Sequence, residues 1–230
     1  MFSSNIRKGW EYLSQQIKKI FTKEEYEEAK RNSLTAFYTP IEIIRFMYKA
    51  LDKIGFTGGR ILEPSCGTGH FFGCMPNKLR NCTRTTGIEL DSISARICRK
   101  LYPKSKIYNK GFEEIQFEDN SFDLIISNIP FGNFKVYDKK YSQLNFKIHN
   151  YYFAKSLDLV RPGGIIAFIT SHYTMDSKDE SVRKYISKKA KLICAVRLPN
   201  NAFKCANTEV ISDIIFLQKK EDNNFNNQKN

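Results

Sequence analysis

FDLIISNIPF, residues 122–131, combines a short apolar run with a turn. The first six residues have the length and character of a buried strand. The last four predict a rigid turn, which offers an amide, two backbone carbonyls and an aromatic face. Such a turn can hold a planar base by its amino group. Taken alone, it is equally typical of an ordinary strand-to-loop connection, since Asn, Pro and the following Gly132 are common turn formers.

Strands and helices are predicted to alternate on both sides of this stretch. Apolar strands are expected near residues 60–64, 84–89, 105–109, 122–127, 164–170, 191–198 and 209–218. Helices are expected near 69–79, 91–102, 149–160 and 178–189. Alternation of this kind predicts an α/β fold with a mostly parallel, seven-stranded sheet covered on both faces. The last two strands have no helix between them, so they should form an antiparallel pair at one edge.

The ends of the chain differ in composition from the middle. Residues 4–31 have apolar side chains at intervals of three and four, which predicts an amphipathic helix. We expect a helical extension over 1–32, one domain over 33–219, and a disordered polar tail over 220–230. A further helix is expected to start with Thr39 as its N-cap and with Glu42 completing a capping box.

A second turn follows the predicted strand Arg60-Ile61-Leu62-Glu63. Pro64 ends the strand, and Gly67 and Gly69 would let the backbone approach a ligand. Glu89 ends the next strand about 20 residues after Gly67, where a carboxylate can hold the two hydroxyls of a ribose. The third glycine of a dinucleotide site is absent, so a mononucleoside with a charged side arm fits better.

Composition limits the remaining classes of function. The chain has 230 residues and a net charge of +13, which favours polyanionic partners, although a lysine-rich proteome would give the same excess. Six cysteines form no C-x-x-C pair, so neither a structural zinc nor another metal site is expected. No apolar run is long enough to cross a bilayer, and no secretory signal is present. We therefore expect a cytoplasmic protein without a membrane partner.

The motifs together resemble a known family. EPSCGTGHF (63–71), GIEL (87–90) and SNIPF (127–131) resemble the amino-group methyltransferases that use S-adenosyl-L-methionine. With FYTP (37–40) ahead of them, the order resembles the gamma class of adenine-specific DNA methyltransferases over residues 33–218. RLPNNAF (197–203) and TEVISDIIFLQK (208–219) are similar to methylase domains of mobile-element and restriction-type proteins.

This resemblance implies a single Rossmann-like methyltransferase domain that binds S-adenosyl-L-methionine. The residues implied in cofactor binding are Tyr38, Thr39, Pro40, Glu63, Pro64, Cys66, Gly67, Gly69, Glu89, Leu90 and Phe112. Those implied in catalysis are Asn128, Ile129, Pro130 and Phe131. The chain departs from the family twice: Ile129 stands where a proline is usual, and Gly111-Phe112-Glu113 stands where an aspartate is frequent.

The implied reaction is methyl transfer to the exocyclic amine of an adenine that is flipped out of duplex DNA. An amine in RNA, a glutamine amide in protein, and a catalytically silent subunit that binds DNA or a partner remain alternatives. Residues 132–148 interleave lysines with aromatic side chains and suit a nucleic-acid lip, or else form a solvated loop. Target recognition would come from these residues, the first helix, a partner subunit or a larger parent protein.

Overall fold

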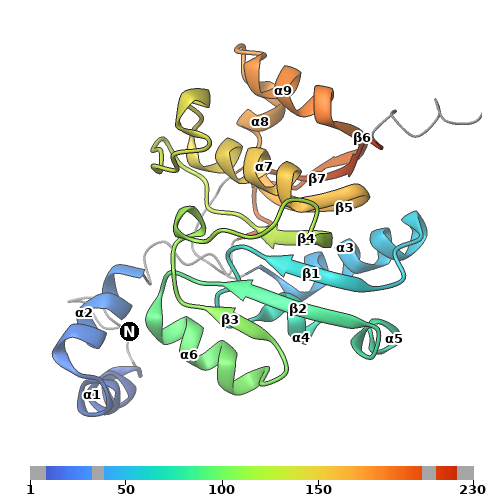
Figure 1. The fold of residues 1–230 in the computed structure, drawn as a ribbon. Helices are drawn as coiled ribbons and strands as arrows, with labels where there is room; N and C mark the ends of the chain where they lie inside the picture. The colour runs from blue at the N-terminus through green and yellow to red at the C-terminus, as the bar shows by residue number, and fades with distance from the viewer. Residues whose placement is uncertain (1–8, 33–38, 204–210, 222–230) are drawn as a thin grey trace, which may run out of the picture.

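The computed structural model describes residues 9–32, 39–203 and 211–221. In this part of the chain, seven strands form one sheet in the order β3-β2-β1-β4-β5-β7-β6 (Figure 1). They are β1 (Gly59–Glu63), β2 (Thr83–Ile88), β3 (Lys106–Tyr108), β4 (Phe122–Asn128), β5 (Val160–Ser171), β6 (Ala190–Arg197) and β7 (Ser212–Lys219). β3, β2, β1, β4 and β5 run parallel, and β7 is antiparallel to both β5 and β6. The predicted α/β sheet with an antiparallel pair at one edge is confirmed.

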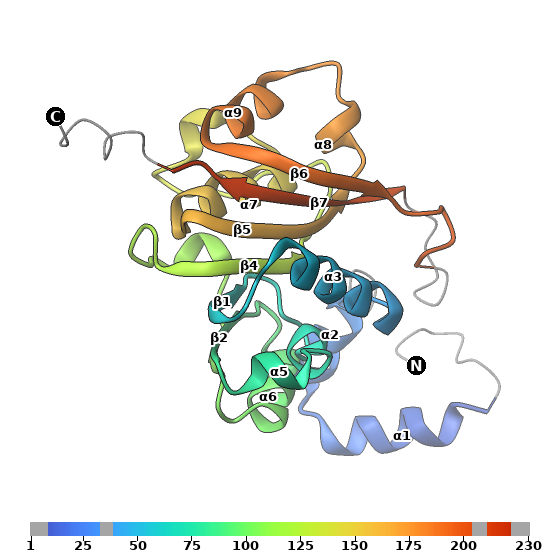
Figure 2. The ribbon, with the colours of Figure 1, turned by 90° about the vertical axis from the view of Figure 1, so that its right-hand side faces the viewer.

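Helices cover both faces of this sheet (Figures 1 and 2). They are α3 (Ile41–Ile54), α4 (His70–Gly73), α5 (Asn77–Arg80), α6 (Ser92–Leu101), α7 (Ile148–Leu159), α8 (Tyr173–Asp176) and α9 (Ser181–Lys189). The first two helices, α1 (Glu11–Ile20) and α2 (Lys23–Asn32), lie outside these layers. Two 3-10 turns, η1 (Phe112–Glu114) and η2 (Ser142–Leu144), lie in the connections. No helix in the described ranges is long and apolar enough to cross a bilayer.

The core divides according to the alternation of side chains along β4. Leu124 and Ile126 pack in the cluster that contains the buried face of α3. Ile125, between them, packs in the cluster that contains the buried side chains of α7. Successive side chains of a strand point to opposite faces, so a central strand that is covered on both sides must be apolar throughout. This requirement explains the uninterrupted run Leu124–Ile126.

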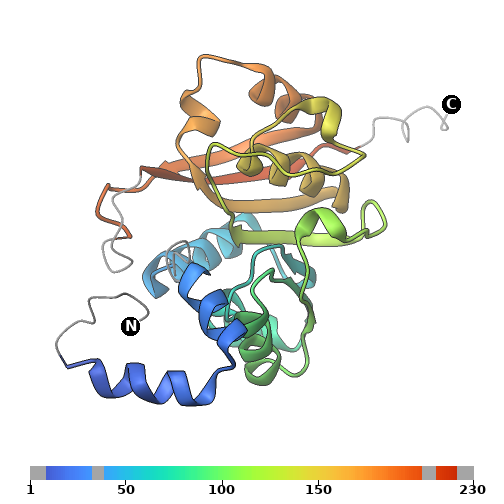
Figure 3. The same ribbon diagram turned by 90° about the vertical axis from the view of Figure 1, so that its left-hand side faces the viewer.

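The N-terminal extension is not the single helix expected over 4–31. Within the described residues it forms two helices, α1 and α2, which meet at Phe21 and Thr22. The Thr22 hydroxyl accepts the Glu25 backbone N–H (3.2 Å), and a Glu25 carboxylate oxygen accepts the Thr22 N–H (3.0 Å). This reciprocal capping box starts a new helix. The expectation of a single helix rested on apolar spacing alone, which does not show such a cap. Glu25 also pairs with Arg96, which holds α2 beside α6 (Figure 3).

Two further helix boundaries differ from the expectation. α3 begins at Ile41 with Pro40 in the N-cap position, and no side chain caps it. The predicted Thr39 cap and Glu42 capping box are therefore wrong, and Thr39 is buried instead. The helix expected over 69–79 is divided into α4 and α5 because Pro76 cannot continue a helix, and it stands as the N-cap of α5.

Candidate functional site

A cavity of about 460 Å³ lies at the carboxyl ends of β1, β2 and β4. Open parallel sheets bind ligands at this edge, where successive connections diverge. The predicted site residues that line the cavity are Thr39, Glu63, Pro64, Cys66, Gly67, Glu89, Leu90, Phe112, Asn128, Ile129, Pro130 and Phe131. Pro40 and Gly69 do not line it. Tyr38 lies outside the described residues.

The Glu89 carboxylate connects the two loops that follow β1 and β2. One oxygen accepts the Gly67 backbone N–H at 2.7 Å, and the other accepts the Asp91 N–H at 2.8 Å. Burial raises the pKa of Glu89, although these backbone hydrogen bonds act in the opposite direction. The carboxylate therefore holds the glycine loop in place, and its remaining lone pairs stay available to a hydroxyl donor in the cavity.

The two glycines of the loop have different roles. Gly67 has φ of +53°, and a Cβ on it would meet no atom within 4 Å, so its backbone faces open space at the cavity. Gly69 has φ of +88°, and a Cβ there would lie 2.5 Å from the Tyr102 ring and 2.8 Å from the Cys98 sulfur. The first glycine leaves room for a ligand, and the second lets α6 pack closely against the loop.

Glu63 places a carboxyl group in the wall of the cavity. The side chain is buried, and its Oε2 atom has no hydrogen-bond partner among the described residues. Burial raises the pKa of Glu63 well above its ordinary value, and the charge of nearby Glu89 adds to this effect. A buried carboxyl oxygen with no partner among the described residues can accept a hydrogen bond from a ligand in the cavity. A positively charged amine would satisfy it.

Cys66 holds the loop after β1 against β2 and α6. Its backbone N–H donates to the Ile88 carbonyl at 2.9 Å, and its sulfur lies 4.0 Å from that of Cys98 on α6. The contact with Cys98 and burial both raise the pKa of Cys66, so the thiol is protonated. A protonated, buried thiol is a poor nucleophile, which agrees with a packing role.

The tip after β4 is fixed by the neighbouring strand. Asn128 is the last residue of β4 and lies opposite Ile169 of β5. The Ile129 N–H donates to the Ile169 carbonyl at 3.1 Å, and the Ile129 side chain is buried in the core. Pro130 and Phe131 are half-buried at the cavity. A proline at position 129 would have no N–H for this bond, so isoleucine anchors the turn in another way.

Several residues of the wall lack a signal in the motifs. Tyr152 is buried on α7, and its ring centroid lies 4.9 Å from that of Phe112. It lines the cavity together with Lys110 and Val136. These residues come from the connections after β3 and β4 and from the following helix, and only the packing of α7 on the sheet brings Tyr152 to the cavity.

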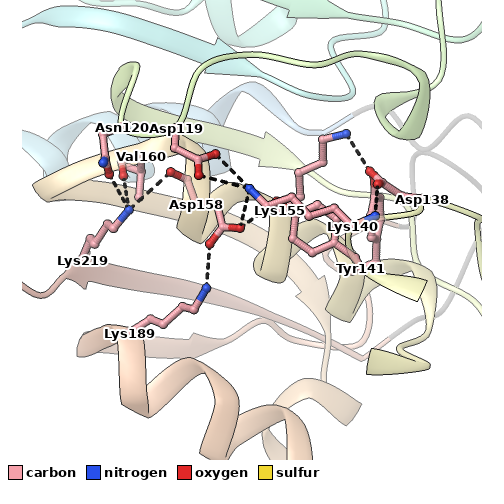
Figure 4. A network of polar contacts seen from close by, with 11 residues as sticks. Asp119, Asn120, Asp138, Lys140, Tyr141, Lys155, Asp158, Val160, Lys189 and Lys219 are labelled. Carbon is pink, nitrogen blue, oxygen red and sulfur yellow. Dashed lines mark hydrogen bonds and ion pairs between the residues drawn. The ribbon is translucent and has the colours of Figure 1, made fainter. Parts of the chain in front are cut away.

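A buried lysine joins the two sides of the site. Lys155 on α7 donates to the Phe112 backbone carbonyl at 2.7 Å. It also donates to Asp138 Oδ2 at 2.9 Å (Figure 4). The Tyr151 hydroxyl donates to the same carboxylate oxygen at 2.8 Å. Burial raises the pKa of Asp138, but these two donors outweigh it and hold the pKa below its usual range. Lys155 therefore links the Phe112 wall to the connection between β4 and α7.

The chain was then compared with known proteins. A family model described as N-6 DNA methylase matches residues 20–229. The chain belongs to the N-6 DNA methylase family. This methylase chain is 30% identical over 193 residues to defense against restriction protein B of Escherichia phage P1, covering 81% of the chain and 8% of the phage protein. It is 23% identical to the methylase subunit of the type I restriction enzyme EcoEI of Escherichia coli, covering 84% of the chain and 45% of the subunit.

Solved structures confirm the fold of this N-6 DNA methylase. The type I restriction-modification methyltransferase subunit of Streptococcus thermophilus superposes with a TM-score of 0.67 at 17% identity, over 80% of the chain and 45% of that subunit. A Listeria monocytogenes protein classed as a class I S-adenosylmethionine-dependent methyltransferase gives 0.68 at 20% identity, over 80% of the chain and 61% of that protein. The chain thus has the fold of enzymes that use S-adenosyl-L-methionine, and it spans less than half the length of the two relatives named above.

The cavity fits that cofactor on its own features. The unpartnered Glu63 oxygen suits an ammonium group, and the open space at Gly67 admits a ligand against the backbone. The buried Phe112 ring provides an apolar wall for a nucleobase. These three features would suit the amino-acid end, the middle and the base end of one elongated molecule.

Proposed function

We propose that this chain transfers a methyl group from S-adenosyl-L-methionine to the exocyclic amine of an adenine flipped out of DNA. The observation that supports this most directly is that the tip at 128–131 and the loops at Gly67 and Glu89 line one cavity. A donor held by the loops and an acceptor held by the tip would therefore face each other.

The roles of the cofactor-binding residues follow from their chemistry. S-adenosyl-L-methionine supplies an electrophilic methyl group on a sulfonium. Glu63 would pair with the amino group of its methionine part, and Thr39, with Tyr38, would contact that end. Glu89 would accept hydrogen bonds from the ribose while it keeps the Gly67 loop in place. Phe112, held by Lys155, would contact the adenine ring.

The tip would prepare the acceptor. An amine on adenine is a weak nucleophile because its lone pair is delocalised into the ring. The Asn128 side-chain oxygen and the Ile129 carbonyl would accept its two hydrogens and stabilise the positive charge that develops on nitrogen. Phe131 would stack on the base, and Pro130 would keep the turn rigid. Alignment of amine and methyl group can be worth roughly 7–11 kcal/mol.

The same pocket chemistry suits other planar amines, so the acceptor needs a separate argument. The net charge of +13 and the lysines of residues 132–148 favour a nucleic acid over a protein glutamine. A catalytically silent DNA-binding subunit is the second candidate. It is favoured by Ile129 in place of the usual proline, and by similarity to a phage protein named for defence against restriction rather than for methylation.

The test uses the purified chain with S-adenosyl-L-methionine labelled in its methyl group. Duplex DNA, RNA and a protein extract are offered separately, and the labelled nucleoside or amino acid is identified after complete digestion. We expect label in N6-methyladenine from DNA. Label in RNA or in glutamine would replace the proposed substrate, and cofactor binding without any transfer would support the silent subunit.

A further inference from the structure

A second cavity of about 290 Å³ lies beside the main one. It is formed by the connection between β4 and α7 together with Tyr151 of α7, and Val136 lines both cavities. Tyr152, the next residue of α7, lines the main cavity. The two cavities are therefore adjacent, and we call the smaller one the side pocket.

The side pocket is built by an anchored segment rather than a loose loop. The Tyr141 hydroxyl donates to Asp158 at 2.9 Å, and the Lys140 ammonium lies 3.1 Å from the same carboxylate (Figure 4). Asp138 is held by Lys155 and Tyr151, as described above. The Ile148 N–H donates to the Phe134 carbonyl at 2.9 Å and closes the segment. The pocket walls are thus positioned before a ligand arrives.

Aromatic side chains and one lysine line the side pocket. Four of its nine lining residues are aromatic: Tyr137, Tyr141, Phe146 and Tyr151. Lys135 is the one charged residue among the nine, all of which belong to the described part of the chain. Tyr137 is 77% exposed, so its ring is free to stack on a planar group at the pocket mouth. Aromatic rings beside a lysine are the usual means of binding single-stranded nucleic acid.

The position of the side pocket indicates which nucleotide it would bind. Val136 lines both cavities, so a base held in the side pocket would lie next to a base held in the main cavity. We propose that the side pocket binds the base of a nucleotide next to the target in the same DNA strand, with Tyr137 stacked on it and Lys135 near its phosphate. This proposal rests on the proposed function, because it takes the main cavity as the site of the target base.

Binding rather than methyl transfer tests this proposal. A fluorescein-labelled heptamer with one central dA among dT nucleotides is titrated with the chain in the presence of S-adenosylhomocysteine, and anisotropy gives the affinity. An abasic nucleotide then replaces each neighbour of dA in turn. We expect one of the two replacements to weaken binding about tenfold, the loss that follows from removing one stacked base.

The variant Tyr137→Ala makes the assignment specific. It should weaken binding of the intact heptamer about tenfold and abolish the effect of the abasic replacement, because both changes remove the same contact. Tyr173→Ala is the matched control, since Tyr173 is also exposed and lines neither cavity. Lys135→Gln should reduce the salt dependence of binding by about one ion, whereas Lys188→Gln should not.

The possible outcomes distinguish a failure of the side-pocket assignment from a failure of the proposed methyl transfer. An abasic penalty that is equal in the wild type and in Tyr137→Ala, or no binding of the heptamer at millimolar protein, overturns the side-pocket assignment. Failure to methylate adenine is read in the labelling assay and leaves the anisotropy result intact. Tighter binding of the same heptamer in ribonucleotide form would assign the pocket to RNA and overturn the DNA strand.

Discussion

Glu63 is a buried carboxyl group whose partner is expected to come with the cofactor. Its pKa is raised, so between the ordinary and the raised pKa the folded chain holds a proton there that the unfolded chain has lost. Because the folded state binds more protons than the unfolded state, raising the pH disfavours the folded state. Stability should therefore fall as the pH rises above the ordinary pKa of 4.5 towards the raised value.

The buried Glu63 carboxyl should lower the stability of the free chain and strengthen the binding of the cofactor. The variant Glu63→Gln tests both effects. Without cofactor it should melt a few degrees higher than the wild type at pH 8, and the difference should shrink towards pH 4. It should also bind S-adenosyl-L-methionine about 10- to 100-fold more weakly, because a charge-assisted hydrogen bond is lost. Thermal unfolding across pH and calorimetric titration measure the two effects. Equal melting temperatures at both pH values would contradict the raised pKa.

The two loop glycines provide a matched pair of substitutions. Gly69→Ala should destabilise the chain by about 2–4 kcal/mol, because a left-handed backbone and a clash with Tyr102 and Cys98 add together. Gly67→Ala carries the backbone cost alone, about 1–2 kcal/mol, and should mainly weaken cofactor binding. Urea unfolding of both variants checks the order. A larger loss for Gly67→Ala would contradict the packing role of Gly69.

Asn128 should separate chemistry from cofactor binding. Asn128→Ala should lower the rate of methyl transfer at least about 100-fold, the loss typical when one preorganised polar group is removed. Its affinity for S-adenosyl-L-methionine should change little, because the cofactor is assigned to the loops after β1 and β2. Single-turnover transfer and calorimetry measure the two quantities. A transfer rate close to that of the wild type would remove Asn128 from the proposed mechanism.

Local motifs predicted the residues that the strand ends and their loops bring to the main cavity. They did not predict the residue that α7 brings to it. Glu63, Glu89 and Asn128 stand at or directly after strand ends, and Gly67 lies in the loop after β1. A parallel sheet brings such ends together without further information. Tyr152 reaches the same cavity only through the packing of α7 on the sheet. Its position depends on tertiary contacts, which no spacing in the sequence encodes.

At the scale of elements, the connection between β4 and α7 depends on a buried ion pair. Lys155→Met would leave the Asp138 carboxylate buried without its charged partner, which should cost about 3–5 kcal/mol. The double change with Asp138→Asn should recover part of this loss. The exposed pair Lys184–Glu180 is the control, and Lys184→Met should cost under about 1 kcal/mol. Urea unfolding compares them, and equal losses would contradict the anchoring role.

The elements themselves were predictable where a periodic pattern was long enough. β4, α6 and α7 fall within about one residue of the expected bounds because apolar spacing decides them. The breaks at Thr22 and Pro76 were missed, since a single capping residue or proline overrides a continuing apolar pattern. Strand order could be expected only as far as the antiparallel pair at the edge.

For the whole molecule, the positive charge makes a prediction about salt. If six phosphates are contacted, the affinity for duplex DNA should fall roughly 1,000-fold between 50 and 200 mM salt. Anisotropy of a labelled duplex over this range measures the slope. A neutral peptide that contains glutamine should show no comparable dependence. A flat salt response for DNA would indicate that the charge of +13 does not act at the binding surface.

The reversal of β7 has a consequence for the edge of the sheet where the cavity opens. β6 ends at Arg197 and β7 begins at Ser212, and Ser212 lies opposite Ser171, the last residue of β5. The chain therefore leaves and re-enters the sheet on the same rim as the turn at Asn128. A connection between antiparallel strands at this rim can change in length without altering the strands that it joins, so length differences between related proteins are expected there.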